Sequence, residues 1–158
     1  MPMQRELIKK KHYRQNDEAA CIPACLRMVL SLYEVDISEE YLIELLNTGI
    51  TGSTLDNLEG LKQINFEAIV EQSSLVELAL YLQETNMPAI VVLYTRYLDY
   101  LAADSLHAVV VVGVDEEKVY FNDPLRSEHP IILSIDRFHP AWEYWGQLLI
   151  KLRRITTD

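Results

Sequence analysis

The hydrophobic pattern of this sequence changes its period near residue 88. Before that point, apolar residues mostly recur at helical spacing, whereas the later part holds β-branched apolar runs of strand length. We expect helices at about 21–33, 38–47, 54–63, 73–84 and 135–145. We expect strands at about 66–70, 89–94, 107–112, 118–122, 131–133 and 147–155. Helices concentrated in the first half and strands in the second predict an α+β fold, with a helical layer packed on a largely antiparallel sheet.

The length and composition of the chain favour one domain. Its 158 residues suffice for a substantial core, since hydrophobic residues make up 49% of them. The sequence shows no internal repeat, low-complexity tract or linker. We therefore expect residues 1–158 to form a single domain, with a basic extension over residues 1–14.

The charge is distributed unevenly along the chain. Residues 1–14 hold five basic side chains and one acidic side chain, and residues 151–158 hold three basic side chains and one acidic side chain. Since the total charge of the chain is −10, residues 15–150 carry a charge of −16. Such a body repels a phosphate backbone, so no nucleic acid is expected as a partner. The basic ends are either solvated termini or contacts for an acidic partner.

The apolar segments are too short for a membrane. The longest run, 108–114, has the length of a strand, whereas a helix that spans a bilayer needs about 20 apolar residues. The N-terminal lysines precede no apolar segment of signal-peptide length. The only two cysteines make no disulfide framework. These features predict a cytoplasmic protein without a transmembrane segment.

Cys21 and Cys25 stand in the first turns of the helix expected at 21–33. A helix N-terminus lowers the pKa of a thiol because its unpaired N–H groups favour the thiolate, which is the nucleophilic form. Cys21 is therefore a candidate nucleophile. Cys25 lies in line with other apolar positions one turn later, and we expect it in the core. For both cysteines a buried structural thiol is the alternative, and a redox pair is a third interpretation.

His107 opens an apolar strand, and Asp123 follows it sixteen residues later. The acidic segment 115–117 predicts a hairpin turn that brings residue 107 opposite about 124–126. Asp123 is then a close neighbour of His107. A carboxylate beside an imidazole fixes its tautomer and supports its cationic form, as the base of a thiol nucleophile requires. Asn122 is an alternative orienting group, although alternation sends it to the opposite face from Asp123.

Gln15 stands six residues before Cys21. A side-chain amide there can donate an N–H to the oxyanion of a tetrahedral intermediate, together with the backbone N–H of Cys21.

No cofactor is expected, and no metal site either, because the four histidines share no ligand spacing with one another or with the cysteines.

Two groups of aromatic and apolar residues have a less specific pattern. One either forms a rim for substrate or packs as an amphipathic segment; its members are Tyr94, Tyr97, Leu98, Tyr100 and Leu101. The other is expected to cover the sheet from the last helix and consists of Phe138, Trp142, Tyr144 and Trp145.

Gln15, Cys21, His107 and Asp123 together resemble the papain-like peptidases of the bacteriocin-processing type, which remove double-glycine leader peptides and often form the N-terminal domain of an ABC exporter. Further shared features are the pair 24–25 on the helix, the apolar strand that starts at His107, the Asp-Pro pair at 123–124 and the connection 51–54. The resemblance implies a papain-like α+β fold, a Cys21–His107–Asp123 triad and Gln15 in the oxyanion hole.

The chain departs from this pattern beside the nucleophile and in its extent. The family commonly has Asp before the cysteine and Gly after it, whereas this sequence has Ala20 and Ile22, which puts double-glycine specificity in question. No Gly-rich phosphate loop with Lys occurs, so a stand-alone form is expected, and association with an exporter or another partner protein is left open.

The leading hypothesis is a cysteine endopeptidase that cleaves leader or precursor peptides through a thioester intermediate. Its partner is then a peptide or protein substrate. One alternative is a catalytically silent papain-like module that binds peptides or proteins. Another is a deamidase or transglutaminase, since the same triad can transfer the acyl group to water or to an amine.

Overall fold

A six-stranded antiparallel sheet organises the fold. The computed structural model describes residues 8, 21–46, 55–99, 104–126 and 129–156. The strands lie in the order β1-β6-β2-β3-β4-β5, and each neighbouring pair runs antiparallel. Their bounds are β1 Phe66–Gln72, β2 Ala89–Tyr94, β3 Leu106–Val114, β4 Lys118–Asn122, β5 Ile131–Ser134 and β6 Leu148–Arg154. The expected strands and the expected α+β class are therefore confirmed.

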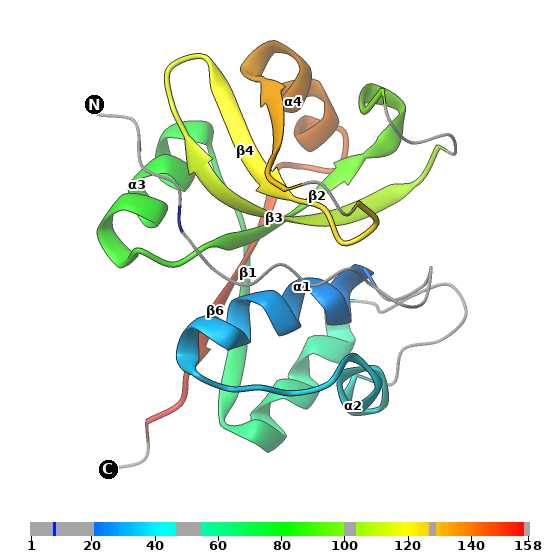
Figure 1. The fold of residues 1–158 in the computed structure, drawn as a ribbon, viewed down its shortest axis with the longest axis vertical. Helices are drawn as coiled ribbons and strands as arrows, with labels where there is room; N and C mark the ends of the chain where they lie inside the picture. Colours follow the sequence, from blue (N-terminus) through cyan, green and yellow to red (C-terminus); the bar gives the residue numbers. More distant parts are fainter. Residues whose placement is uncertain (1–7, 9–20, 47–54, 100–103, 127–128, 157–158) are drawn as a thin grey trace.

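The helices pack on the sheet from two sides. The α-helices are α1 Cys21–Leu30, α2 Glu39–Leu45, α3 Leu75–Thr85 and α4 Ile135–Glu143. Three 3₁₀ segments accompany them, η1 Ser31–Tyr33, η2 Leu55–Ile64 and η3 Thr95–Tyr97. In Figure 1, α1 and α2 lie below strands β2 and β3, and α4 lies above them. Helix α1 contacts β3 and β2, whereas α4 contacts β2, β4 and β5.

Serine caps begin two of the helices. The Ser38 hydroxyl accepts a hydrogen bond from the Tyr41 N–H at 3.1 Å, and the Ser74 hydroxyl accepts one from the Glu77 N–H at 3.1 Å. Each bond satisfies a backbone donor that has no partner within its helix. The helix expected at 54–63 is the 3₁₀ segment η2.

Segment η2 approaches α2 closely at Gly60. A Cβ atom there would lie 2.3 Å from the carbonyl oxygen of Leu45, the last residue of α2. Glycine at this position therefore lets the two backbones pack at a separation that no other residue permits.

The hairpin of β3 and β4 turns at Asp115, as expected. The Asp115 carboxylate accepts hydrogen bonds from the N–H groups of Glu117 and Lys118 at 2.8 and 2.7 Å. The register shifts between Val111 and Gly113, which makes Val112 the extra residue of a β-bulge. The carbonyl of Val112 accepts a hydrogen bond from the Ile8 N–H at 2.8 Å.

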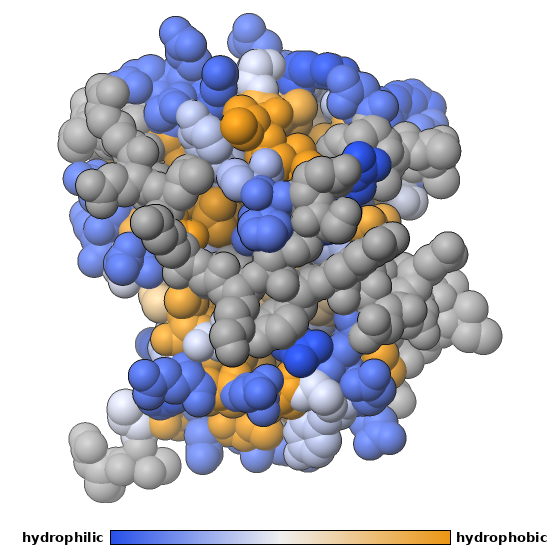
Figure 2. Space-filling model, viewed as in Figure 1, coloured by the Kyte–Doolittle hydropathy of each residue, from blue (hydrophilic) through white to orange (hydrophobic). Residues whose placement is uncertain are grey.

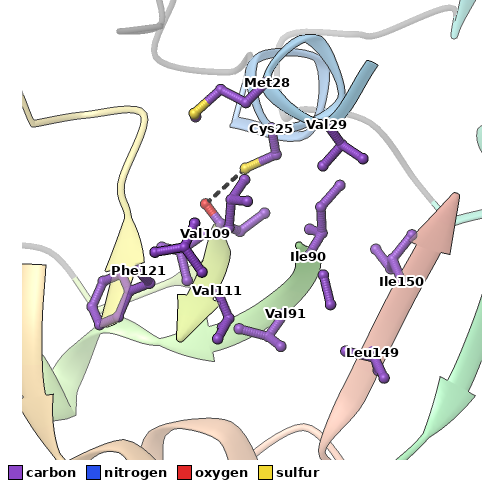
Figure 3. Close-up of a cluster of buried hydrophobic side chains, with 14 of the residues drawn as sticks. Cys25, Met28, Val29, Ile90, Val91, Val109, Val111, Phe121, Leu149 and Ile150 are labelled. Carbon is purple, nitrogen blue, oxygen red and sulfur yellow. Dashed lines mark hydrogen bonds between the residues drawn. The ribbon is translucent and has the colours of Figure 1, made fainter. Parts of the chain in front are cut away.

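Part of the core lies between α1 and the central strands. Figure 3 shows side chains from α1 pointing toward β2, β3 and β6, and these side chains are almost entirely buried. The labelled residues lie on both faces of the sheet, because neighbours in a strand point to opposite sides; they are Cys25, Met28, Val29, Ile90, Val91, Val109, Val111, Phe121, Leu149 and Ile150. Outside the core, hydrophilic side chains predominate over the face seen in Figure 2, with smaller hydrophobic areas between them. This core holds the start of α1 against the start of β3.

Some elements end earlier than their periodicity predicts. Helix α1 stops at Leu30 and continues as the short segment η1, which Glu34 closes in the left-handed conformation at φ 61°. Helix α4 stops at Glu143, so the prediction for its aromatic group is wrong in part. Phe138 and Trp142 are fully buried, but Tyr144 and Trp145 lie beyond the helix and are exposed.

Candidate active site

Cys21 is the first residue of α1. The next residues on the helix are buried, which fixes its start against the sheet. Burial raises the pKa of the Cys21 thiol, but hydrogen bonds with His107 and with the backbone of Ala108 and Ile22 lower it, and the net result is a pKa below the ordinary value. A backbone group lowers a thiol pKa by donating its N–H to the sulfur, because the charged form is then the one stabilised.

His107 lies near the start of β3 and is 5% exposed. Its Nε2 atom is 2.7 Å from Oδ1 of Asp123, a carboxylate with no exposure at all. Burial lowers the pKa of His107, but the hydrogen bonds with Asp123 and Cys21 raise it to about 9. The close pairing of His107 with Asp123 that the sequence predicts is thus confirmed.

The register of the hairpin explains why these two side chains meet. Asn122 pairs with Val110, so the same register places Asp123 opposite Val109. Val109 and His107 are two residues apart and share one face of β3, so Asp123 faces the same side as His107. Asn122 faces the other side and is not the partner of the imidazole.

The loop after β4 holds Asp123 in place. The Leu125 N–H donates to Oδ1 of Asp123 at 2.8 Å, and the Arg126 N–H donates to its carbonyl oxygen at 3.1 Å. The carboxylate therefore has a fixed position before it meets the imidazole.

The imidazole bridges the thiol and the carboxylate. Because Nε2 faces Asp123, the hydrogen bond with Cys21 falls on the other ring nitrogen, Nδ1. The pKa of Cys21 is lowered and that of His107 is raised, so both changes favour a thiolate paired with an imidazolium. This is the resting state of a thiol nucleophile with its acid–base partner already protonated.

Cys25 is a separate case. Its side chain is fully buried, and its Sγ donates to the carbonyl oxygen of Ala108 at 3.4 Å. Both cysteines are free thiols. The expectation that Cys25 belongs to the core is confirmed, and the interpretation as a redox pair is not supported. Gln15 lies outside the described residues.

The segment proposed as a rim for substrate is mainly structural in its described part. Tyr94 pairs with Leu106 at the end of the β2–β3 ladder and stacks on Tyr144, which follows α4, with 3.9 Å between the ring centroids. Leu98 is buried. Since Leu106 and His107 are consecutive in a strand, the Tyr94 side chain lies on the α4 side of the sheet and not beside His107. Residues 100 and 101 lie outside the described part.

Two further properties of the described residues are relevant to the site. They contain no cluster of three or more His, Cys, Asp or Glu side chains that could hold a metal ion. None of the helices in this part of the chain is long and apolar enough to cross a membrane.

The comparison with known proteins identifies the family. The Peptidase C39 family model matches residues 9–152. The chain belongs to this family. C39 peptidases are cysteine peptidases, so the thiol, imidazole and carboxylate found together here are the groups that this class of enzyme uses. No match to a curated protein sequence was found.

Solved structures of C39 peptidases have the same fold. The peptidase domain of Streptococcus ComA, described as a bifunctional ABC transporter of a quorum-sensing pathway, is 27% identical, with a TM-score of 0.70 over 91% of this chain and 97% of that one. A double-glycine-motif protease from an AMS/PCAT transporter, solved with its leader peptide, is 20% identical, with a TM-score of 0.71 over 97% of each chain. A putative C39-like peptidase from Bacillus anthracis is 16% identical, with a TM-score of 0.72 over 99% of this chain and 100% of that one. The papain-like architecture of the chain is therefore shown.

Sequence reasoning missed the backbone groups of this C39 site. The N–H groups of Ile22 and Ala108 bind the Cys21 sulfur, and the N–H of Leu125 binds Asp123. Backbone donors leave no signal in residue type, so only the fold reveals the first two. The third had a local signal, because Asp before Pro is typical of a turn in which the carboxylate binds the N–H two residues later.

Proposed function

We propose that this chain is a cysteine peptidase that cleaves leader or precursor peptides. The observation that carries the proposal is the hydrogen-bonded chain from Cys21 through His107 to the buried carboxylate of Asp123. Membership in the C39 family supports the same reaction class. The leader-peptide complex of the transporter protease, which has the same fold, supports this substrate class.

In the proposed reaction, the Cys21 thiolate attacks the carbonyl carbon of the scissile peptide bond. A C–S bond forms, and the carbonyl oxygen becomes an oxyanion that the Cys21 N–H and the side-chain amide of Gln15 stabilise. The His107 imidazolium gives its proton to the leaving amine, the C–N bond breaks, and a thioester remains on Cys21.

Water then releases the second product. The neutral His107 takes a proton from water as the hydroxyl attacks the thioester carbon, and the C–S bond breaks to give a carboxylic acid and the regenerated thiolate–imidazolium pair. Asp123 keeps Nε2 of the imidazole occupied, so Nδ1 stays directed at the reacting atoms through both steps.

The test uses a synthetic precursor peptide with a leader that ends in two glycines, alongside a peptide in which alanines replace them. Cleavage is followed by mass spectrometry, which also locates the cut. We expect the wild-type protein to cleave at least one peptide and the Cys21→Ala variant to cleave none. If the protein cleaves only the double-glycine peptide, it is specific for double-glycine leaders, although Ala20 and Ile22 stand where the family commonly has Asp and Gly.

The same experiment separates the other functions. If incubation with peptides gives no product that depends on Cys21, but the peptides bind, the protein is a silent binding module. If an added amine appears in the product, or a glutamine side chain loses ammonia, the enzyme is a transferase or a deamidase.

A further inference from the structure

The two cysteines of α1 bind the same residue of β3. The Cys25 thiol donates to the carbonyl oxygen of Ala108 at 3.4 Å, and Figure 3 shows this bond between the helix and the strand. Cys21, one turn earlier, is hydrogen-bonded with the backbone of Ala108. Ala108 follows His107 directly. The helix therefore contacts the strand at the residue next to the proposed base.

Ala108 lacks a donor from the neighbouring strand β4. The last pair between β3 and β4 at this end is Val110 with Asn122. Continuing that register by two residues puts Pro124 opposite Ala108, and proline has no N–H to donate. Ala108 is only 2% exposed, so its carbonyl needs a partner inside the protein. The Cys25 thiol provides that partner.

We propose that Cys25 is a positioning residue, whose thiol holds Ala108 against α1 and thereby keeps His107 and the Ala108 N–H in register with Cys21. The role depends on the proton of Cys25, because only the neutral thiol can donate to a carbonyl. Serine at this position would also donate, whereas alanine and valine would not. The inference rests on the proposed role of Cys21 as the nucleophile.

The test measures how fast iodoacetamide alkylates Cys21 as a function of pH, with the modified residue located by mass spectrometry. It needs no substrate. Losing one hydrogen bond in the Cys25→Ala variant is expected to raise the apparent pKa of Cys21 by about half a unit to one unit and to slow its alkylation at pH 6 by roughly three- to tenfold. The Cys25→Ser variant is expected to stay close to wild type.

A matched control separates positioning from packing. The Val29→Ala variant removes buried atoms one turn further along the same helix without removing a donor, so we expect an unchanged pH profile. If Cys25→Ala does not fold, Cys25→Val makes the same comparison with the volume kept. If the pH profile of Cys21 alkylation is unchanged in Cys25→Ala or Cys25→Val, the inference is overturned. An equal shift of that profile in Val29→Ala overturns it as well. An ordinary Cys21 pKa in the wild-type protein overturns the proposed function instead.

Discussion

Replacing Asp123 with Asn tests the electrostatics of the site directly. The substitution keeps the size of a fully buried side chain and removes its charge, while an amide oxygen can still accept from Nε2 of His107 and from the Leu125 N–H. A hydrogen bond to a charged group contributes roughly 1.5–3 kcal/mol, and a neutral one contributes about 1 kcal/mol. The imidazolium should therefore become less stable while the fold is kept.

The expected size of the effect follows from these free energies. One pKa unit corresponds to about 1.4 kcal/mol, so replacing a contribution of roughly 1.5–3 kcal/mol by one of about 1 kcal/mol should lower the pKa of His107 by about half a unit to one and a half units. Starting from about 9 in the wild-type protein, the value in Asp123→Asn should lie at about 7.5 to 8.5. At pH 8, about nine in ten imidazoles are protonated when the pKa is 9, but only about half are when it is 8.

The assay is an NMR titration of the imidazole carbon–proton signals. The protein has four histidines, and the signal absent from the spectrum of a His107→Ala variant assigns His107. Asp115→Asn is the matched control, because it makes the same chemical change at the turn end of the same hairpin. A His107 pKa that stays near 9 in Asp123→Asn, or that falls equally in Asp115→Asn, would refute the electrostatic account.

Three further outcomes are expected. His107→Ala removes a hydrogen bond that lowers the pKa of Cys21, so alkylation of Cys21 at pH 6 should slow by roughly tenfold. Equal alkylation rates in the variant and the wild-type protein would contradict the pairing of Cys21 with His107. Ser74→Ala removes a helix cap and should lower the free energy of unfolding in urea by about 1 kcal/mol, whereas Ser134→Ala, at a cap without a side-chain bond, should change it little. Gly60→Ala places a Cβ 2.3 Å from a backbone carbonyl oxygen and should lower the free energy of unfolding by roughly 1–3 kcal/mol in the same assay. Unchanged stability would show that η2 can shift away from α2.

Periodicity predicts much of this fold because each element buries one face. The runs at 89–94 and 107–112 are strands β2 and β3 almost residue for residue, and Ser38 and Ser74 cap helices as their positions indicate. The ends of helices are harder, since apolar spacing says nothing about where the backbone leaves the helix. Trp145 keeps the helical spacing of Phe138 and Trp142 but lies past the end of α4 and is exposed.

The site divides into a local part and a tertiary part. The pairing of His107 with Asp123 follows from a hairpin of known turn and length, so the sequence is enough to predict it. The contact of Cys21 with His107 depends on how α1 lies across β3, which no spacing determines. In the sequence, only the resemblance to a family joins Cys21 and His107. The bonds of Ala108 with Cys21 and Cys25 are more remote still, because Ala108 contributes only backbone atoms to them.

A one-residue bulge decides whether Asn122 or Asp123 faces the imidazole. Near the turn, Val114 pairs with Val119 and Gly113 with Tyr120. If that register ran on unbroken, position 122 would pair with 111 and share the face of His107, and Asp123 would face the other side. The extra residue at position 112 moves the register by one, so Asp123 takes that face instead. The bulge therefore sets the geometry of the candidate site, and the lone glycine inside an apolar strand is its signal in the sequence.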